Sequence, residues 1–195
     1  MRTLEQQLKE YHPYNEQEER DLAVIRSMLE AKPDVFTREN RVAHMTASSW
    51  LVNTAHDKVL MIYHNIYRSW SWTGGHADGE RDLLAVAMRE AKEETGVSSI
   101  RAVSDDIFSL EILTVNGHEK NGVYVPSHLH MNVTYLLETD EDELLRIKPD
   151  ENSGVQWFLP DEALDACTEE WMIGRIYRKL NQKLLEQPVT DGPQR

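Results

Sequence analysis

The chain has 195 residues, of which 40% are hydrophobic and five are tryptophan, so it can bury a core and is not disordered throughout. Its formal net charge of −13 disfavours a nucleic-acid polymer as the main partner, because phosphate backbones attract basic surfaces. Small phosphorylated substrates remain open, since bound metal ions reverse the sign of a local field.

The cysteine content and the distribution of apolar residues indicate the compartment of the protein. The single cysteine, Cys167, cannot form an internal disulfide, which is consistent with a reducing compartment. Residues 1–20 lack the apolar stretch of a signal peptide, and no apolar run approaches the ~20 residues of a membrane helix. We therefore expect a cytoplasmic protein with no membrane partner.

The N-terminal segment is predicted to be helical. Asn15 is a good helix cap, and apolar residues recur at helical spacing through residues 16–31. A shorter helix is expected around Leu4 to Tyr11, and Pro33 with Asp34 ends this segment. We assign residues 1–40 to an N-terminal helical extension.

The remaining chain predicts strands and helices in alternation. Asn116-Gly117 and Asn121-Gly122 mark a loop. The expected strands are Met45–Asn53, Lys58–His64, Trp70–Thr73, Ile107–Val115, His128–Leu137 and Val155–Leu159. The expected helices are Arg81–Thr95, a turn opening at Pro160, and Thr168–Gln187, followed by a flexible tail at 188–195.

Strands interrupted by one central helix and closed by another predict an α/β fold, in which helical layers cover a mixed sheet. We assign residues 41–187 to this single domain.

Three carboxylates lie on one face of the central helix. Glu90, Glu93 and Glu94 are three and four residues apart, and each residue turns a helix by about 100°. Three acids on one face repel one another unless a cation lies between them, and Mg²⁺ or Mn²⁺ prefers oxygen ligands. A solvated acidic face is the alternative. The Gly-Gly pair before the helix and the stop at Thr95-Gly96 favour the metal.

The segment Gly74–Val97 resembles the Nudix box, G-x5-E-x7-R-E-U-x-E-E-x-G-U, in which U is bulky and apolar. Two positions depart from it: Arg81 replaces the first Glu, and Ala91 replaces the first apolar residue. The wording Gly-Gly-His-Ala-Asp-Gly is similar to that of one Nudix subgroup. The residues in register, counted from Gly75, are Arg89, Glu90, Glu93, Glu94, Gly96 and Val97.

The resemblance implies an α/β/α sandwich that hydrolyses a diphosphate linkage in a nucleoside diphosphate joined to another moiety. It further implies that the Gly75 carbonyl joins Glu90, Glu93 and Glu94 around Mg²⁺ or Mn²⁺, and that a homodimer is possible. The ion would neutralise the phosphates and lower the pKa of a water. Glu93 and Glu151 are both candidates for the base that takes the proton of that water.

Arg89 is expected to orient Glu93, four residues further along the helix. Arg81 cannot brace Arg89, because like charges repel. Asp82 lies seven residues before Arg89, almost two helical turns away, so we predict that Asp82, more than Glu80, holds Arg89.

Several aromatic and imidazole side chains are candidate substrate contacts. His128 and His130 share one strand face, where they could ligate a transition metal, contact substrate phosphate or have no role, and we favour substrate contact. Trp72 could stack on a nucleobase or pack in the core. His76 is a plausible neighbour of the substrate or the metal.

Two other functions share this fold. An isomerase of the isopentenyl-diphosphate type uses a cysteine, but Cys167 falls well after the box. A catalytically weak protein that binds or senses a nucleotide is the main alternative. The intact carboxylates and the absence of a basic C-terminal module favour catalysis.

Overall fold

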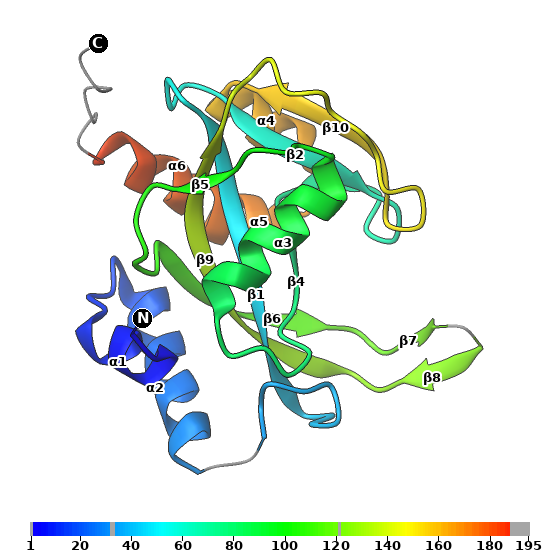
Figure 1. The fold of residues 1–195 in the computed structure, drawn as a ribbon. Coiled ribbons are helices and arrows are strands. Elements are labelled where there is room, and N and C mark those ends of the chain that lie inside the picture. Colours follow the sequence, from blue (N-terminus) through cyan, green and yellow to red (C-terminus); the bar gives the residue numbers. More distant parts are fainter. Residues whose placement is uncertain (1, 32–33, 121, 188–195) are drawn as a thin grey trace.

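A mixed sheet forms the centre of the molecule in the computed structural model, which describes residues 2–31, 34–120 and 122–187 (Figure 1). The sheet has eight strands with the main order β10-β2-β1-β9-β5; β3 pairs with β2, β4 with β1, and β6 with β9. The strands are β1 Ala43–Asn53, β2 Val59–His64, β3 Ser69–Ser71, β4 Thr73–His76, β5 Arg101–Ala102, β6 Ser109–Val115, β9 His128–Thr139 and β10 Asn152–Phe158.

Helices cover both faces of this sheet, which confirms the predicted α/β/α layers. In Figure 1, α3 lies in front of the sheet and the C-terminal helices lie behind it, while α1 and α2 lie side by side at one flank. Among the described residues, no helix has both the length and the apolarity to cross a membrane. The helices are α1 Leu4–Glu10, α2 Glu16–Glu30, α3 Leu83–Thr95, α4 Pro160–Ala166, α5 Glu170–Met172, the π-helix η1 Ile173–Tyr177 and α6 Arg178–Leu185.

The strand β1 is central because it pairs on both edges. It runs parallel to β9 in continuous register, from Ala43 opposite Leu129 to Asn53 opposite Thr139. Its other edge pairs antiparallel with β4 and, further along, with β2. Alternate β1 side chains point to opposite faces, so Leu51 packs in the core beneath α3 and Trp50 in the core beneath the C-terminal helices.

Several elements differ from the sequence prediction, and the short strand β5 was not predicted. The expected strand Trp70–Thr73 is split between β3, which pairs with β2, and β4, which pairs with β1. Gly74 and Gly75 therefore lie in a strand instead of a turn. The predicted loop after Val115 forms a hairpin of β7 His118–Lys120 and β8 Val123–Val125. The predicted helix Thr168–Gln187 begins at Glu170 and contains the π-helical turn.

The N-terminal helices pack onto the sheet as predicted amphipathic elements. Asn15 caps α2, since its side chain accepts a hydrogen bond from the Glu18 N–H, and Leu22 and Ile25 are buried in the core beneath α3. The assignment of residues 1–40 to an extension stays a prediction. Pro33, Asn121 and the tail from Pro188 lie outside the described residues.

Charged residues join α2, β6 and α6 beneath the surface. Lys179 Nζ lies 3.1 Å from Glu18 Oε1 and 3.0 Å from Glu111 Oε1, and all three side chains are at most 3% exposed. Lys183 Nζ adds a second contact of 3.1 Å to Glu18. We call these four residues the buried ion cluster.

The charge of Glu18 is retained in spite of its burial. Burial alone would raise the pKa of this carboxyl, but the charges of Lys179 and Lys183 and hydrogen bonds from Tyr11 and the Tyr14 N–H outweigh it, so the pKa is lowered.

Replacing the central cation tests whether this cluster holds the N-terminal helices to the domain. Lys179→Met leaves two carboxylates buried together with one lysine, and we expect it to lower the free energy of unfolding by about 3–5 kcal/mol in urea denaturation. The control is Arg20→Met. This substitution removes an exposed ion pair between Arg20 and Glu16, both on α2, and should change the free energy of unfolding little. Equal stability of both variants would contradict this prediction.

The lowered pKa of Glu18 also gives the protein an acid sensitivity. The unfolded chain takes up a proton on Glu18 near its ordinary value of 4.5, whereas the folded chain does so only at lower pH. The stability from this carboxylate is thus present above pH 4.5 and is lost as the pH falls through the folded value. We expect the free energy of unfolding to depend less steeply on acidic pH in Glu18→Gln than in wild type. The exposed control Glu16→Gln should have the same pH dependence as wild type.

Candidate active site

Helix α3 carries the three acids that the sequence singled out, and both of its ends are fixed locally. Asp82 caps the first turn, because its Oδ1 accepts a hydrogen bond from the Ala85 N–H at 3.1 Å. Gly96 ends the helix in the left-handed region, at φ 76°, and its N–H donates to the Lys92 carbonyl at 2.9 Å. Between these caps, Glu90, Glu93 and Glu94 form what we call the carboxylate cluster.

Strand β4 lies directly against this cluster, and its glycines make the approach possible. A Cβ on Gly75 would lie 2.5 Å from the carboxyl carbon of Glu90, so a larger residue would displace that carboxylate from its present position. The Gly74 N–H donates to Glu94 Oε2 at 2.9 Å. The backbone at Gly75, predicted as a metal ligand, thus lies beside the carboxylates with which it was grouped.

The loop before β10 adds a fourth acid and a lysine. Lys148 Nζ lies 3.1 Å from Glu93 Oε2 and 3.1 Å from Glu151 Oε2, so it bridges the two candidate bases. Asn152 Nδ2 donates to the Glu94 carbonyl at 2.9 Å and fixes this loop to the end of α3. Lys148 was missed in the sequence, because only the tertiary fold brings it near the helix.

The electrostatics show that negative charge is crowded at Glu94. The pKa of its carboxyl is raised to about 8, chiefly by burial and also by the charges of Glu151 and Glu90, while the Gly74 N–H and Lys148 act in the opposite direction. Its exposed fraction is 3%. Oxygen donors that repel one another in this way suit a hard divalent cation such as Mg²⁺ or Mn²⁺.

Arg89 contacts the acids as predicted, but Asp82, which was expected to hold Arg89, has another role. Its Nη2 donates to Glu90 Oε1 at 2.9 Å, and its Nε lies 3.9 Å from Glu93 Oε1. The prediction that Asp82 braces Arg89 is wrong, because α3 begins at Leu83 and the Asp82 carboxylate is used as the helix cap. Glu80 accepts hydrogen bonds from the N–H groups of Arg81 and Asp82.

Four histidines form a second group at one end of β1, β4 and β9. Each contributes a ring nitrogen, and these nitrogens all lie within 4.8 Å of one another. The sequence placed two of them on one strand face; pairing of β1 with β9 and β4 adds the other two. We call the set the histidine cluster: His44, His76, His128 and His130.

Two members of the histidine cluster have lowered pKa values. Burial, and to a smaller extent the neighbouring imidazoles, lower the pKa of His130 to about 2. Burial also lowers the pKa of His44, which is 4% exposed. His44 went unnoticed in the sequence, because a single histidine in an apolar strand carries no pattern of its own.

Trp72, the predicted nucleobase contact, is 9% exposed and packs edge-on against Tyr177, with ring centroids 5.5 Å apart. Its position favours the core-packing alternative left open by the sequence.

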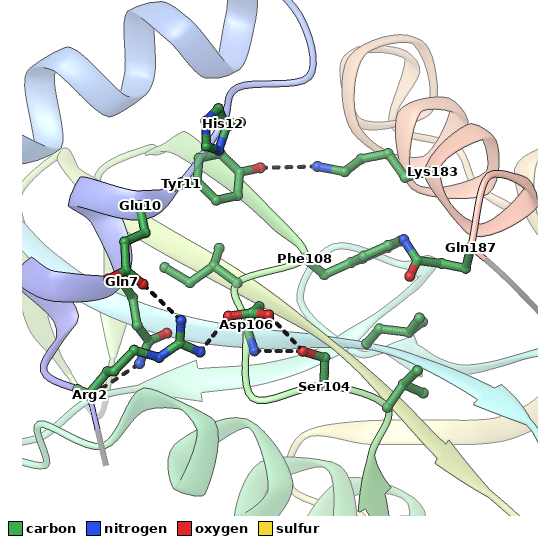
Figure 2. Close-up of a pocket in the computed structure, with 13 residues that line it drawn as sticks. Arg2, Gln7, Glu10, Tyr11, His12, Ser104, Asp106, Phe108, Lys183 and Gln187 are labelled. Atoms are coloured by element: carbon green, nitrogen blue, oxygen red, sulfur yellow. Dashed lines mark hydrogen bonds and ion pairs between the residues drawn. The ribbon is translucent and has the colours of Figure 1, made fainter. Parts of the chain in front are cut away.

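A separate pocket of about 390 Å³ lies between α1, residues 103–108 and α6 (Figure 2). Its side chains include Arg2, which pairs with Asp106, and Tyr11, whose hydroxyl lies 3.0 Å from Lys183 Nζ. It shares no residue with the carboxylate cluster or the histidine cluster.

Comparisons with known proteins agree with this geometry. Two similar solved structures are an Ap4A hydrolase from C. elegans (18% identity, TM-score 0.53, covering 73% of this chain and 98% of that one) and the E. coli dihydroneopterin triphosphate pyrophosphohydrolase (14%, 0.53, 73% and 96%). At these identities they support the fold alone. No curated protein sequence matches the chain significantly.

The family comparison covers most of the domain. The model of the NUDIX domain matches residues 43–180, from the first residue of β1 into α6, and includes the carboxylate cluster. The chain therefore belongs to the Nudix family of hydrolases.

Proposed function

We propose that this protein is a metal-dependent pyrophosphohydrolase that cleaves a diphosphate linkage in a nucleoside diphosphate joined to another moiety. The observation that carries the proposal is the carboxylate cluster, in which Glu90 and Glu94 lie against the glycine backbone of β4 and Glu93 lies beside Arg89 and Lys148. The two similar structures are named for Ap4A and dihydroneopterin triphosphate, which are phosphoanhydrides, and that supports the same class of bond.

The chain offers a donor set that fits a hard cation. We assign the carboxylates of Glu90, Glu93 and Glu94 and the carbonyl of Gly75 as ligands of Mg²⁺ or Mn²⁺. When bound, such an ion neutralises diphosphate charge and lowers the pKa of water. Arg89 orients Glu90 and Glu93 from the side, as its contacts at 2.9 and 3.9 Å indicate.

The proton of the attacking water goes to Glu93 or Glu151 in this proposal. Lys148 contacts both carboxylates, and burial would lower the pKa of this lysine, but the two acids raise it. Its ammonium group holds the two carboxylates side by side, at 3.1 Å from each. Lys148 is thus a positioning residue.

Isomerase chemistry that uses a cysteine finds no support in the fold. The Cys167 thiol is buried, donates to the Trp70 carbonyl at 3.0 Å, and its pKa is raised by burial to about 12. A reactive cysteine needs the opposite environment. Substrate contact by Trp72, His76, His128 and His130 stays a prediction.

Removing the buried ligand tests the hydrolase directly. We expect Glu94→Gln to lower turnover by at least about 100-fold, since the near-isosteric amide lacks the anionic oxygen that the metal requires. The assay uses Ap4A, ADP-ribose, a nucleotide sugar and an oxidised nucleoside triphosphate with Mg²⁺ or Mn²⁺, and reads product masses. The control, Lys92→Gln, changes an exposed residue of the same helix.

Chelation separates catalysis from binding. EDTA should abolish turnover, and added Mg²⁺ or Mn²⁺ should restore it. Wild-type rates in EDTA, or in the Glu94→Gln variant, would sink the proposal. Nucleotide binding without turnover of any substrate would favour the sensing alternative.

The base is identified by pH profiles of kcat/KM for Glu93→Gln and Glu151→Gln. Loss of the base should lower the rate by about 10²–10⁴-fold and flatten the acidic limb of the profile, because no carboxyl then titrates in the rate-limiting step. The other variant should keep that limb. Lys148→Met serves as the control for a residue that only positions the two acids. If the acidic limb of the pH profile is unchanged in both glutamine variants, neither acid is the base.

A further inference from the structure

The histidine cluster has the composition and the geometry of a metal site that the carboxylate chemistry does not explain. We propose that His44, His76, His128 and His130 bind one divalent transition-metal ion of the zinc class, at a site separate from the carboxylate cluster. This inference does not depend on the proposed hydrolase function.

The strand register creates the cluster. His44 on β1 lies opposite His130 on β9, and Thr46, two residues further along β1 on the same face, lies opposite His76 on β4. His44 is the hub of the set, because its ring centroid lies 4.8–5.1 Å from those of the other three histidines. Three strands thus bring four imidazoles together without any local sequence motif.

The distances agree with a tetrahedral ion after small side-chain rotations. Zinc–nitrogen bonds of about 2.0–2.1 Å place the nitrogens of a tetrahedral site roughly 3.4 Å apart. His128 Nε2 lies 3.2 Å from His130 Nε2, close to that separation. The full set of nitrogens, within 4.8 Å, needs only modest contraction.

Backbone carbonyls orient two of the rings in the manner of metal-ligating histidines. His44 Nδ1 lies 3.0 Å from the Asn40 carbonyl, and His128 Nδ1 lies 2.9 Å from the Pro126 carbonyl. A proton on each Nδ1 makes these hydrogen bonds and leaves the Nε2 lone pair for a ligand.

The Nε2 atom of His44 is the strongest single indication. It is buried and has no hydrogen-bond partner within the part of the chain that the structure describes. A buried polar atom without a partner costs about 1–3 kcal/mol, so a ring placed at the centre of three others needs a reason. A coordinated ion supplies one.

The donor type selects the metal. Imidazole nitrogens favour zinc, nickel, copper or iron, whereas Mg²⁺ and Mn²⁺ favour the oxygen donors of the carboxylate cluster. The nearby Asp78 carboxylate is engaged in a two-point contact with Arg38, at 2.7 and 2.5 Å, so the ligand set is imidazole alone.

Strand geometry keeps the two sites apart. Gly75 faces Glu90 on α3, and successive residues of a strand point to opposite faces, so His76 points to the other face of the sheet. A metal on the histidine cluster would fix the end of β4 to β1 and β9. It would thereby hold the neighbouring glycine backbone in place beside the acids.

Zinc binding to the untagged, full-length protein tests the proposal. After removal of metals, we expect competition with a chromophoric chelator to show one tightly bound Zn²⁺ per chain. Glu94→Gln should retain it, whereas His44→Gln and His128→Ala should bind at least about 100-fold more weakly. His118→Ala is the matched control, since His118 lies near His128, with ring centroids 6.5 Å apart, but outside the cluster.

Two further readouts keep the test decisive if the buried His44 variant folds poorly. Co²⁺ should give the intense visible bands of a tetrahedral site in wild type and Glu94→Gln, and these bands should be absent in the half-buried His128→Ala variant. Zn²⁺ should raise the Tm of wild type and of Glu94→Gln, and this Zn²⁺-dependent rise should be absent in His128→Ala. The proposal would be overturned if wild type and His128→Ala bound zinc equally well, or if only Glu94→Gln lost zinc binding. Contact with substrate would then be the function left for the histidines.

Discussion

The parallel pairing of β1 with β9 is the constraint on which both candidate sites depend. The two strands are distant in sequence, and their continuous register fixes which side chains meet. A shift of one residue would turn every side chain to the opposite face, so the apolar cores on both sides make the register strict. With β1 fixed, β4 pairs on its free edge and brings the two glycines to α3 and His76 to His130.

Polar side chains continue from this pairing across one face of the sheet. Asn132 accepts hydrogen bonds from the hydroxyls of Thr46 and Ser48, at 2.9 and 3.0 Å, and donates to Glu111 Oε2 at 3.0 Å. Glu111 belongs to the buried ion cluster, so the network reaches from the strands beside the histidines to α2 and α6. Buried networks of this kind stabilise a fold only when their members are satisfied, which makes the strand register and the helix positions mutually dependent.

Local signals in the sequence predicted the local parts of the molecule. Asn15 and Gly96 mark helix ends because a cap acts within one turn, and the glutamates of α3 share a face because helix periodicity alone decides it. Long-range pairing decided the rest. Lys148 reaches Glu93 only through the loop before β10, and His44 meets His130 only across two strands. Asp82 was misplaced because a shift of two residues in the helix start converts an internal position into a cap.

The alternation of a single strand separates two kinds of donor. Gly75 and His76 are adjacent in the chain, yet one lies among carboxylate oxygens and the other among imidazole nitrogens. Oxygen donors favour hard cations and nitrogen donors favour softer ones, so the two sites need not compete for one ion. The absence of a side chain at Gly75 lets the backbone of β4 pass beside the Glu90 carboxylate in its present position, because a Cβ there would lie 2.5 Å from the carboxyl carbon. Two neighbouring residues of β4 therefore approach the two kinds of donor from opposite faces of the sheet.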